Sequence, residues 1–419
     1  MTDPIVVVGG SLAGMAAAAR LAKARHRVLL LEETGRLGGR WADTEADVLP
    51  PVLTFPAPWR DLFKKSGRAF DAELGRHDVG LIAAPPAVHH FADGATLTLP
   101  SDRGQQWTTL SQAYGESTAK SWQALLDDLD DTWQRLRPLG LEGEFTDDAL
   151  TWRRRAGLHP RVSVEDVARR LNHPHLGEIV RSVAWRLGSQ PRLTPGWCAV
   201  RLSVERTFGR WRLVEQEQPA PTVRLLDLLT ERLATRGVEV HLESPVTAIE
   251  PYRVRTRRGW VASSATVCTV NPWSYATLAD RSDREMARRI RWSKPAMAPS
   301  ISARLLPDSS EVSEAITHTP GGPIVEYHRP TSSGTLVTTH DHRQGRPDPS
   351  FGTQWHGWRT WLRMPPLRSG IPMTFLASAS SRGGNDPWAQ LLSGALATYL
   401  AHEHLAGADI RPTNKAYRG

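Results

Sequence analysis

Cysteine is nearly absent from this chain: Cys198 and Cys268 are the only two among 419 residues. Two cysteines support neither a disulfide framework nor a cysteine-rich metal site. No apolar run reaches the roughly 18 residues that a membrane crossing needs, and the first apolar strand already begins at Ile5. That start leaves no room for a signal peptide. We therefore expect a cytoplasmic protein with no structural metal.

Lysine is also scarce, so the formal net charge of +8 comes mostly from arginine. The basic residues are dispersed rather than gathered in one block, which argues against a nucleic-acid partner. A basic surface also suits the edge of an anionic membrane, where an apolar substrate would reside. We expect no nucleic-acid partner and keep peripheral membrane association open, while the oligomeric state stays undetermined.

The first forty residues organise the chain. Apolar residues 5–8 lead into a glycine-rich turn at 9–14, then into helix formers up to Lys23 and a second apolar strand at 28–31 that ends at Glu32. This order predicts a buried parallel strand, a tight turn, a helix and a second strand. In such a unit the helix N-terminus binds a diphosphate, and the terminal acid accepts from a ribose hydroxyl. An acid here favours FAD or NAD over NADP.

The glycine fingerprint is incomplete, because it reads Gly9-x-Ser11-x-x-Gly14 where Gly-x-Gly-x-x-Gly is usual. Ser11 puts a side chain where the backbone approaches the diphosphate, and its hydroxyl either donates to phosphate or crowds it. The alternative for the whole segment is a parallel sheet that binds no nucleotide. The candidate cofactor-binding residues of this unit are Gly9, Ser11, Leu12, Ala13, Gly14, Glu32 and Glu33.

A second motif follows directly, since residues 36–40 read Arg-Leu-Gly-Gly-Arg. It resembles the Arg-x-Gly-Gly-Arg segment of the flavoprotein family that includes amine oxidases, protoporphyrinogen oxidases and phytoene desaturases. The resemblance implies FAD, with Gly38 and Gly39 letting the loop lie flat and Arg40 supplying positive charge near the diphosphate and isoalloxazine. The alternative is a simple glycine turn between two solvated arginines.

Other segments resemble the phytoene-desaturase-like branch of that family. Residues 207–211 read Thr-Phe-Gly-Arg-Trp, and residues 375–397 resemble the carboxy-terminal flavin segment, with a strand, a small-residue turn, Gly383-Gly384 and a helix. The resemblance places Val246 beside the adenine of FAD and Ser378, Gly383 and Gly384 beside the flavin. Ser11, Leu49 and Ser378 stand where the family prefers glycine.

The length exceeds one ordinary core, so two intertwined domains are expected. We predict an α/β fold with a discontinuous, Rossmann-like FAD-binding domain and an inserted α+β substrate domain. The FAD-binding domain comprises residues 1–74, 222–280 and 371–419. The substrate domain comprises residues 75–221 and 281–370. Within it, a hairpin is expected over 88–99 and helices over 121–136, 164–171 and 176–187.

Three groups of polar residues in the inserted domain contain side chains that can bind metal ions, but we do not interpret them as metal sites. Asp127, Asp128, Asp130 and Asp131 fill the polar face of the predicted helix 121–136 and are read as a solvated face. His173 and His175 lack further ligands at suitable spacing and are read as loop residues. The run 340–342, His-Asp-His, is read as a polar turn because neighbouring arginines would repel a cation.

The resemblance implies an FAD-dependent oxidoreductase that desaturates or isomerises an apolar, isoprenoid-like substrate by hydride transfer to flavin N5. No catalytic side chains are identified, because no Ser-His-Asp, Cys-His or paired-carboxylate arrangement is legible. Sixteen tryptophans are present, and those outside the cofactor segments either line an apolar substrate tunnel or pack in the core. The alternative function is a relative that binds FAD weakly or not at all and works as a binding or partner subunit.

Overall fold

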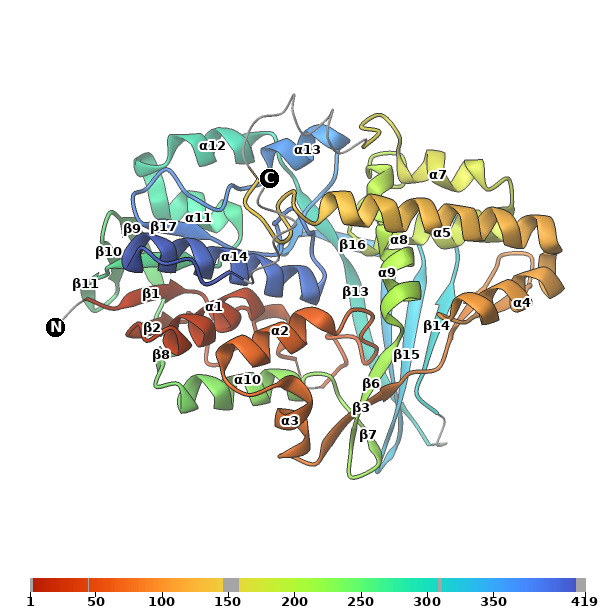
Figure 1. The fold of residues 1–419 in the computed structure, drawn as a ribbon, viewed down its shortest axis with the longest axis horizontal. Coiled ribbons are helices and arrows are strands. Elements are labelled where there is room, and N and C mark those ends of the chain that lie inside the picture. The colour runs from red at the N-terminus through yellow and green to blue at the C-terminus, as the bar shows by residue number, and fades with distance from the viewer. Residues whose placement is uncertain (1–2, 44, 146–157, 308–310, 412–419) are drawn as a thin grey trace.

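The structure is a computed structural model that describes residues 3–43, 45–145, 158–307 and 311–411. One half of the molecule is built on a parallel sheet flanked by α1, α10 and α14, and the other on a long sheet covered by α5, α8 and α9 (Figure 1). Within the described part, no helix has both the length and the apolar character for crossing a bilayer.

The first sheet is parallel throughout, with the strand order β17-β12-β1-β2-β8. Its bounds are β1 Ile5–Val8, β2 Val28–Leu31, β8 Glu239–His241, β12 Ala265–Cys268 and β17 Thr374–Leu376. All residues of β1, β2, β12 and β17 are buried, which explains their uninterrupted apolar sequences. The predicted α/β fold with a Rossmann-like core is therefore confirmed.

The helices of this half pack on the parallel sheet or on neighbouring elements. They are α1 (Leu12–Lys23), α2 (Ala57–Ser66), α3 (Phe70–Gly75), α10 (Arg224–Thr235), α11 (Pro272–Ala279), α12 (Arg284–Arg291) and α14 (Pro387–Ala406), with short helical turns at Gly39–Trp41 and Asp280–Ser282. The α1 helix packs closely on α14, where a β-carbon at Gly394 would lie 2.5 Å from the carbonyl oxygen of Ala13. The first and last segments of the chain are thus joined by direct packing.

The second half contains a six-stranded sheet of order β13-β16-β15-β14-β4-β5. Its bounds are β4 Ala87–His90, β5 Thr96–Leu99, β13 Pro295–Leu306, β14 Ser313–Thr317, β15 Ile324–Thr331 and β16 Gly334–Thr353. The pairs are antiparallel except β14 with β4. There are two smaller three-stranded sheets among the described residues. One contains β9 (Val246–Glu250), β10 (Arg253–Thr256) and β11 (Gly259–Ala262). The other contains β3 (Val79–Ala83), β6 (Trp211–Glu215) and β7 (Gln218–Ala220).

The helices of the second half confirm the three predicted by periodicity. They are α4 (Arg103–Tyr114), α5 (Glu116–Leu136), α7 (Val164–Arg170), α8 (Pro174–Arg186), α9 (Val200–Phe208) and α13 (Trp358–Arg363), with a short turn of helix at Gly196–Ala199. All strands of the parallel sheet fall within 1–74, 222–280 and 371–419, and those of the six-stranded sheet within 75–221 and 281–370. The domain boundaries themselves stay a prediction.

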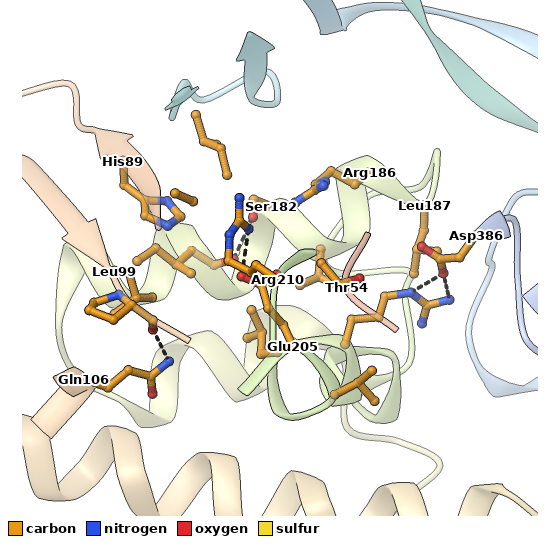
Figure 2. Close-up of a pocket in the computed structure, with 18 of the residues that line it drawn as sticks. Thr54, His89, Leu99, Gln106, Ser182, Arg186, Leu187, Glu205, Arg210 and Asp386 are labelled. Atoms are coloured by element: carbon orange, nitrogen blue, oxygen red, sulfur yellow. Dashed lines mark hydrogen bonds and ion pairs between the residues drawn. The ribbon is translucent and has the colours of Figure 1, made fainter. Parts of the chain in front are cut away.

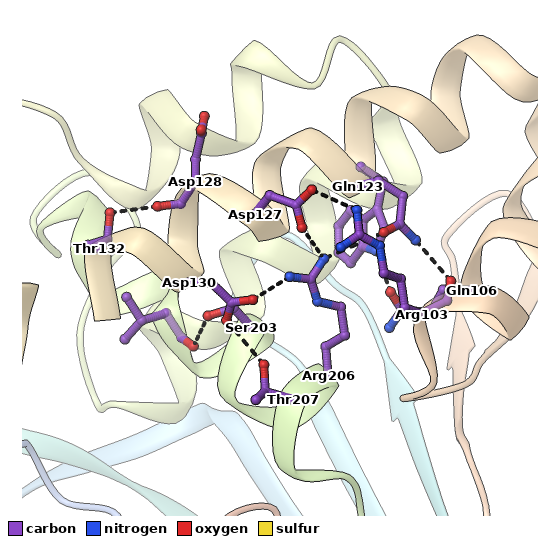
Figure 3. Close-up of polar contacts among 12 residues, drawn as sticks. Arg103, Gln106, Gln123, Asp127, Asp128, Asp130, Thr132, Ser203, Arg206 and Thr207 are labelled. Carbon is purple, nitrogen blue, oxygen red and sulfur yellow. Dashed lines mark hydrogen bonds and ion pairs between the residues drawn. The ribbon is translucent and has the colours of Figure 1, made fainter. Parts of the chain in front are cut away.

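The aspartates of α5 are only partly a solvated face. Arg206 of α9 is 5% exposed and pairs with Asp127 at 2.8 Å and Asp130 at 2.5 Å, while Arg103 of α4 reaches Asp127 at 2.9 Å (Figure 3). Asp128 and Asp131 are exposed. The side chains of Asp127 and Asp130 are still 45% and 35% exposed, so the face is solvated in part, and their pairing with a buried arginine on another helix is not indicated by the acidic run alone.

The interpretation of residues 340–342 as a turn was wrong. All three lie inside β16, where His340 pairs in register with Ile301 and Val325 on the neighbouring strands. Burial lowers the pKa of His340 to about 4 and that of His342 to about 3, so both are neutral at pH 7. In the described part of the chain, no three His, Cys, Asp or Glu side chains are placed to hold a metal ion.

Candidate cofactor site

A cavity of about 580 Å³ lies at the carboxyl ends of β1, β2 and β12. This is the edge of a parallel sheet where α/β proteins bind their ligands, and the volume is within the usual range of roughly 300–1,000 Å³. Nine of the predicted cofactor-binding residues line it: Gly9, Ser11, Glu32, Glu33, Gly38, Gly39, Arg40, Val246 and Ser378. Segments far apart in the sequence therefore meet at one cavity.

Ser11 caps the helix that points at this cavity. The Ser11 hydroxyl accepts from the backbone N–H of Gly14 at 3.4 Å. The same hydroxyl donates to Oγ1 of Thr269 at 3.2 Å. Serine is among the residues preferred at a helix N-cap, because its side chain satisfies one of the free backbone donors. The Ser11 hydroxyl is thus engaged within the protein.

Glu32 joins the end of β2 to the glycine-rich turn. Its Oε2 accepts from the backbone N–H of Gly10 at 2.6 Å, and its Oε1 accepts from the N–H and the hydroxyl of Thr34 at 2.8 and 2.7 Å. The side chain is 7% exposed and lines the cavity. Oε1 already accepts two hydrogen bonds, but Oε2 accepts only one and has a further lone pair, so this arrangement still allows Oε2 of Glu32 to accept from a ligand hydroxyl.

The two glycines after β2 bring their loop against the first turn. Gly38 has a φ of +104° and Gly39 a φ of +55°, in the left-handed region that glycine adopts without strain. The N–H of Gly38 donates to the carbonyl of Gly10 at 2.7 Å. A β-carbon on Gly38 would lie 2.8 Å from Leu226. The loop therefore lies flat against the turn before α1, and this brings Arg40 to the cavity wall.

Arg40 is a buried cation with an incomplete set of partners. Its side chain is 13% exposed, and Nη1 lies 3.6 Å from Oδ2 of Asp348, beyond hydrogen-bond range. Among the described residues, neither Nε nor Nη1 has a hydrogen-bond partner. The guanidinium lies 4.2 Å from the ring centroid of Phe351 and 5.0 Å from that of Trp41. Burial lowers the pKa of Arg40 to about 10, so it remains charged at pH 7.

The remaining predicted residues are not among those that line the cavity. Leu12, Ala13 and Gly14 are buried inside α1, with Gly14 against the carbonyl of Gly9. Gly383 and Gly384 lie beside Arg201, which donates to the carbonyl of Gly383 at 2.7 Å. Leu49, which stands at a family glycine position, packs in the main core with 2% exposure.

Several lining residues were missed by the sequence reasoning. They are Thr269, Asn271 and Ser274 after β12, Ser350 in β16 and Gln390 in α14. The first three follow the carboxyl end of a parallel strand, and that rule could have found them once β12 was assigned. Ser350 and Gln390 come from segments without a local signal, since only the packing of the two halves brings them here.

A second cavity of about 100 Å³ lies between α8, α9 and β4 (Figure 2). Charged side chains Arg186, Arg201, Glu205, Arg210 and Asp386 line it together with apolar residues. Each arginine is paired: Arg201 with Asp386 at 2.6 Å, Arg210 with Glu205 at 2.9 Å and Arg186 with the nearby Glu314 at 3.3 Å. The cavity is therefore polar but balanced in charge.

Glu314 is the buried centre of this network. It is 2% exposed and accepts from Arg210 at 2.6 Å. Burial alone would raise the pKa of Glu314, but the charges of Arg210 and Arg186 outweigh burial and hold it below its ordinary value. The carboxylate thus stays ionised between β14 and the helices that cover the sheet.

The tryptophans outside the cofactor segments mostly pack in the core rather than line a tunnel. Four of them, Trp133, Trp197, Trp355 and Trp361, surround a void of only about 20 Å³ together with Trp388 of the predicted cofactor segment. Trp122 is 1% exposed in the same core. Trp107 and Trp292 are exposed instead, and Trp152 lies outside the described residues.

Comparison with known proteins shows similarity to a Rossmann-like domain family and to a carotenoid desaturase. Residues 7–72 match the family described as NAD(P)-binding Rossmann-like domain. Hydroxyneurosporene desaturase of Cereibacter sphaeroides is 26% identical over 260 residues, which cover 58% of this chain. The chain spans about half the length of that relative, with 50% covered.

The solved structures extend the similarity to nearly the whole fold. Cyclohexylamine oxidase from Brevibacterium oxydans superimposes with a TM-score of 0.62 at 15% identity, covering 97% of this chain and 100% of that one. Rab GDI from Plasmodium falciparum gives 0.53 at 9% identity, with 98% and 99% covered. Sequence similarity to a carotenoid desaturase and a fold shared with an amine oxidase relate this chain to the superfamily that contains the phytoene desaturases and the amine oxidases.

Proposed function

We propose that this protein is an FAD-dependent oxidoreductase acting on an apolar, isoprenoid-like substrate by hydride transfer to flavin N5. The single observation that carries the cofactor assignment is Arg40. A buried guanidinium with unpartnered nitrogens on a cavity wall is costly unless an anion completes its hydrogen bonds. A diphosphate is such an anion, and arginine is suited to binding it.

The residues around Arg40 fit the other parts of FAD. The α1 helix begins at Leu12 directly after the cavity wall, so its free N–H groups and positive end favour a phosphate there. Glu32 and Val246 line the same cavity, where Glu32 would accept from the adenosine ribose and Val246 would contact the adenine. Ser378 lies on the wall near the start of α14, where the isoalloxazine is expected.

FAD, when bound, supplies the acceptor for a hydride from a C–H bond, so few catalytic side chains are required. The chain contributes position, charge and exclusion of water. Arg40 and the start of α1 would hold the diphosphate. The tryptophan core next to the second cavity would leave room for little water, since the void within it is only about 20 Å³.

The substrate assignment rests on the similarity to a carotenoid desaturase. The second cavity is lined by apolar residues such as Leu99, Ile179 and Ile316 as well as by its ion pairs. Its volume of about 100 Å³ holds only a small part of a long isoprenoid. A substrate of this class would fit here only if the cavity between α8, α9 and β4 became wider.

A second candidate function is a binding or partner subunit that has kept the fold without tight FAD binding. The engaged Ser11 hydroxyl favours it, because this side chain occupies the position where glycine normally admits the diphosphate. The fold similarity to Rab GDI also supports this candidate, because the name of that protein is not that of an oxidoreductase.

The absorbance spectrum of the purified protein separates the two functions. Flavin bands that persist through gel filtration, or that appear after FAD is added and unbound FAD removed, support the oxidoreductase. Protein that stays colourless after this treatment contradicts it and supports the subunit. Bleaching of bound flavin by an isoprenoid hydrocarbon under anaerobic conditions tests the substrate, with a primary amine as the comparison compound.

A further inference from the structure

The α12 helix and the residues after it carry an unusual concentration of positive charge. Arg284, Arg288 and Arg291 follow one another at spacings of four and three residues, so they lie on one face of the helix. All three are exposed. In the part of the chain that the structure describes, none of them has an ion-pair partner.

The opposite face of α12 holds the helix to the protein. Met286 is 1% exposed in the core, and Asp283 caps the first turn by accepting from the N–H of Met286 at 3.0 Å. Arg289 donates to Glu285 at 2.6 Å and to the carbonyl of Leu362 at 3.1 Å. The inward arginine is thus satisfied, whereas the outward ones face solvent.

Trp292 completes this surface. It is 69% exposed, and the guanidinium of Arg291 lies 5.9 Å from the centroid of its ring. Lys294 follows as another exposed cation. The neighbouring helix α13, which Arg289 ties to α12, adds the exposed Arg359 and Arg363. Both helices lie at the upper edge of the molecule (Figure 1).

We propose that this basic face, formed by Arg284, Arg288, Arg291, Trp292 and Lys294 with Arg359 and Arg363, docks the protein on an anionic lipid bilayer. Unpaired arginines are attracted to anionic headgroups, and an exposed tryptophan beside them prefers the headgroup level of a bilayer. Because the apolar side of α12 is used within the protein, docking relies on charge and one indole ring. The association is therefore reversible and salt-sensitive.

The β10–β11 hairpin also presents an exposed tryptophan, Trp260, and exposed arginines at positions 255, 257 and 258. Arg253 covers the Trp260 ring at 4.3 Å and is itself paired with Glu250 at 2.5 Å. The α12 face differs in its more exposed indole, with Trp292 at 69% against 42% for Trp260. The proposal is independent of the flavin, since no residue of the basic face lines the cofactor cavity.

The test is flotation of the purified full-length chain with vesicles of phosphatidylcholine, with and without phosphatidylglycerol. We expect binding only to the anionic vesicles and release at high salt. The triple variant Arg284→Gln, Arg288→Gln, Arg291→Gln should bind about a hundredfold more weakly, at roughly fivefold per basic residue near the membrane surface. Trp292→Ala should cause a smaller loss.

The matched control removes three exposed cations elsewhere, with Arg76→Gln, Lys120→Gln and Arg192→Gln. It should retain vesicle binding, and both triple variants should melt at the temperature of the wild type because the substituted side chains are exposed. An equal loss in the control would overturn the proposal, since net charge alone would then explain binding. Failure of the wild type to float would also overturn it, including the case in which it binds an RNA oligonucleotide instead.

Discussion

Nη1 of Arg40 lies 3.6 Å from Oδ2 of Asp348, although Arg40 follows the second strand of the parallel sheet and Asp348 belongs to the longest strand of the other sheet. The pair is close enough for attraction but too far apart for a hydrogen bond. The two halves of the molecule thus meet at a buried cation that lines the cofactor cavity and has two nitrogens without a hydrogen-bond partner among the described residues.

Replacing Arg40 should separate cofactor binding from stability. Arg40→Ala removes charged hydrogen bonds to the diphosphate and should weaken FAD binding by about 1.5–3 kcal/mol. Fluorescence titration of FAD-free protein with FAD measures this loss. The melting temperature of that FAD-free protein should change little, because the buried charge lacks hydrogen bonds there. Arg40→Lys is the control that keeps the charge but loses the planar fork. Undiminished FAD affinity in Arg40→Ala would remove this residue from the site.

Glu32 should affect both stability and cofactor affinity. Glu32→Ala leaves the backbone N–H groups of Gly10 and Thr34 without their acceptor, which costs about 1–3 kcal/mol in the FAD-free protein. FAD affinity should also fall, if the same carboxylate accepts from the ribose. Urea unfolding of FAD-free protein measures the first effect and FAD titration the second. Glu33→Ala, at an exposed neighbour on the same cavity, is the control for unfolding.

Ser11→Gly should leave the fold nearly unchanged. The hydroxyl makes long contacts to Gly14 and Thr269, and glycine at an N-cap costs only a few tenths of a kcal/mol, against about 1 kcal/mol for alanine. If Ser11 crowds the diphosphate, the glycine variant binds FAD more tightly than wild type, and Ser378→Gly adds to the gain. A weaker complex in Ser11→Gly would show instead that the hydroxyl donates to phosphate.

Acid should destabilise the protein through its buried histidines. Nδ1 of His89 lies 2.9 Å from Nε2 of His318, and the two rings are stacked. Burial, with the charge of His175, lowers the pKa of His318 from 6.5 to about 4. Because the folded pKa lies below the unfolded value, this group's contribution is complete above pH 6.5 and is lost as the pH falls towards 4. The loss is about 3 kcal/mol at 1.4 kcal/mol per pH unit.

The measurement is the free energy of unfolding between pH 4 and 6.5 in wild type and His318→Gln, which keeps a hydrogen-bonding partner for His89 but does not titrate. The variant should be less stable at neutral pH and show a smaller slope with pH. His356→Gln, at an exposed position, should retain the slope of the wild type. An unchanged slope in His318→Gln would contradict the assignment.

Histidines also illustrate where sequence reasoning failed. His173 and His175 were predicted to lie in a loop, but His173 caps α8 and His175 is inside its first turn. His175 stacks on Phe91 at 4.1 Å between the centroids and contacts Tyr114 and Asp93. These contacts join α4, α8 and the β4–β5 hairpin, and no pattern within the segment itself indicates them.

The local sequence determined the nucleotide-binding unit. Continuous apolar strands, a glycine turn, a run of alanines and an acid at residue 32 specify a strand, turn, helix and strand, because each element depends on backbone preferences and burial that nearby residues decide. The same reasoning found α5, α7, α8 and the β4–β5 hairpin. The resemblance of residues 36–40 to the flavoprotein motif added Gly38, Gly39 and Arg40, which line the same cavity as Glu32.

Only the tertiary structure decided how distant segments complete the site. The partner of Arg40 is Asp348, and Gln390 and Ser350 reach the same wall from other parts of the chain. Asp130 is held by Arg206 rather than by water alone, and residues 340–342 form a strand because β13 and β15 pair with it on both sides. Such outcomes depend on long-range pairing and burial, whose energy is set by side chains that are adjacent in space and remote in sequence.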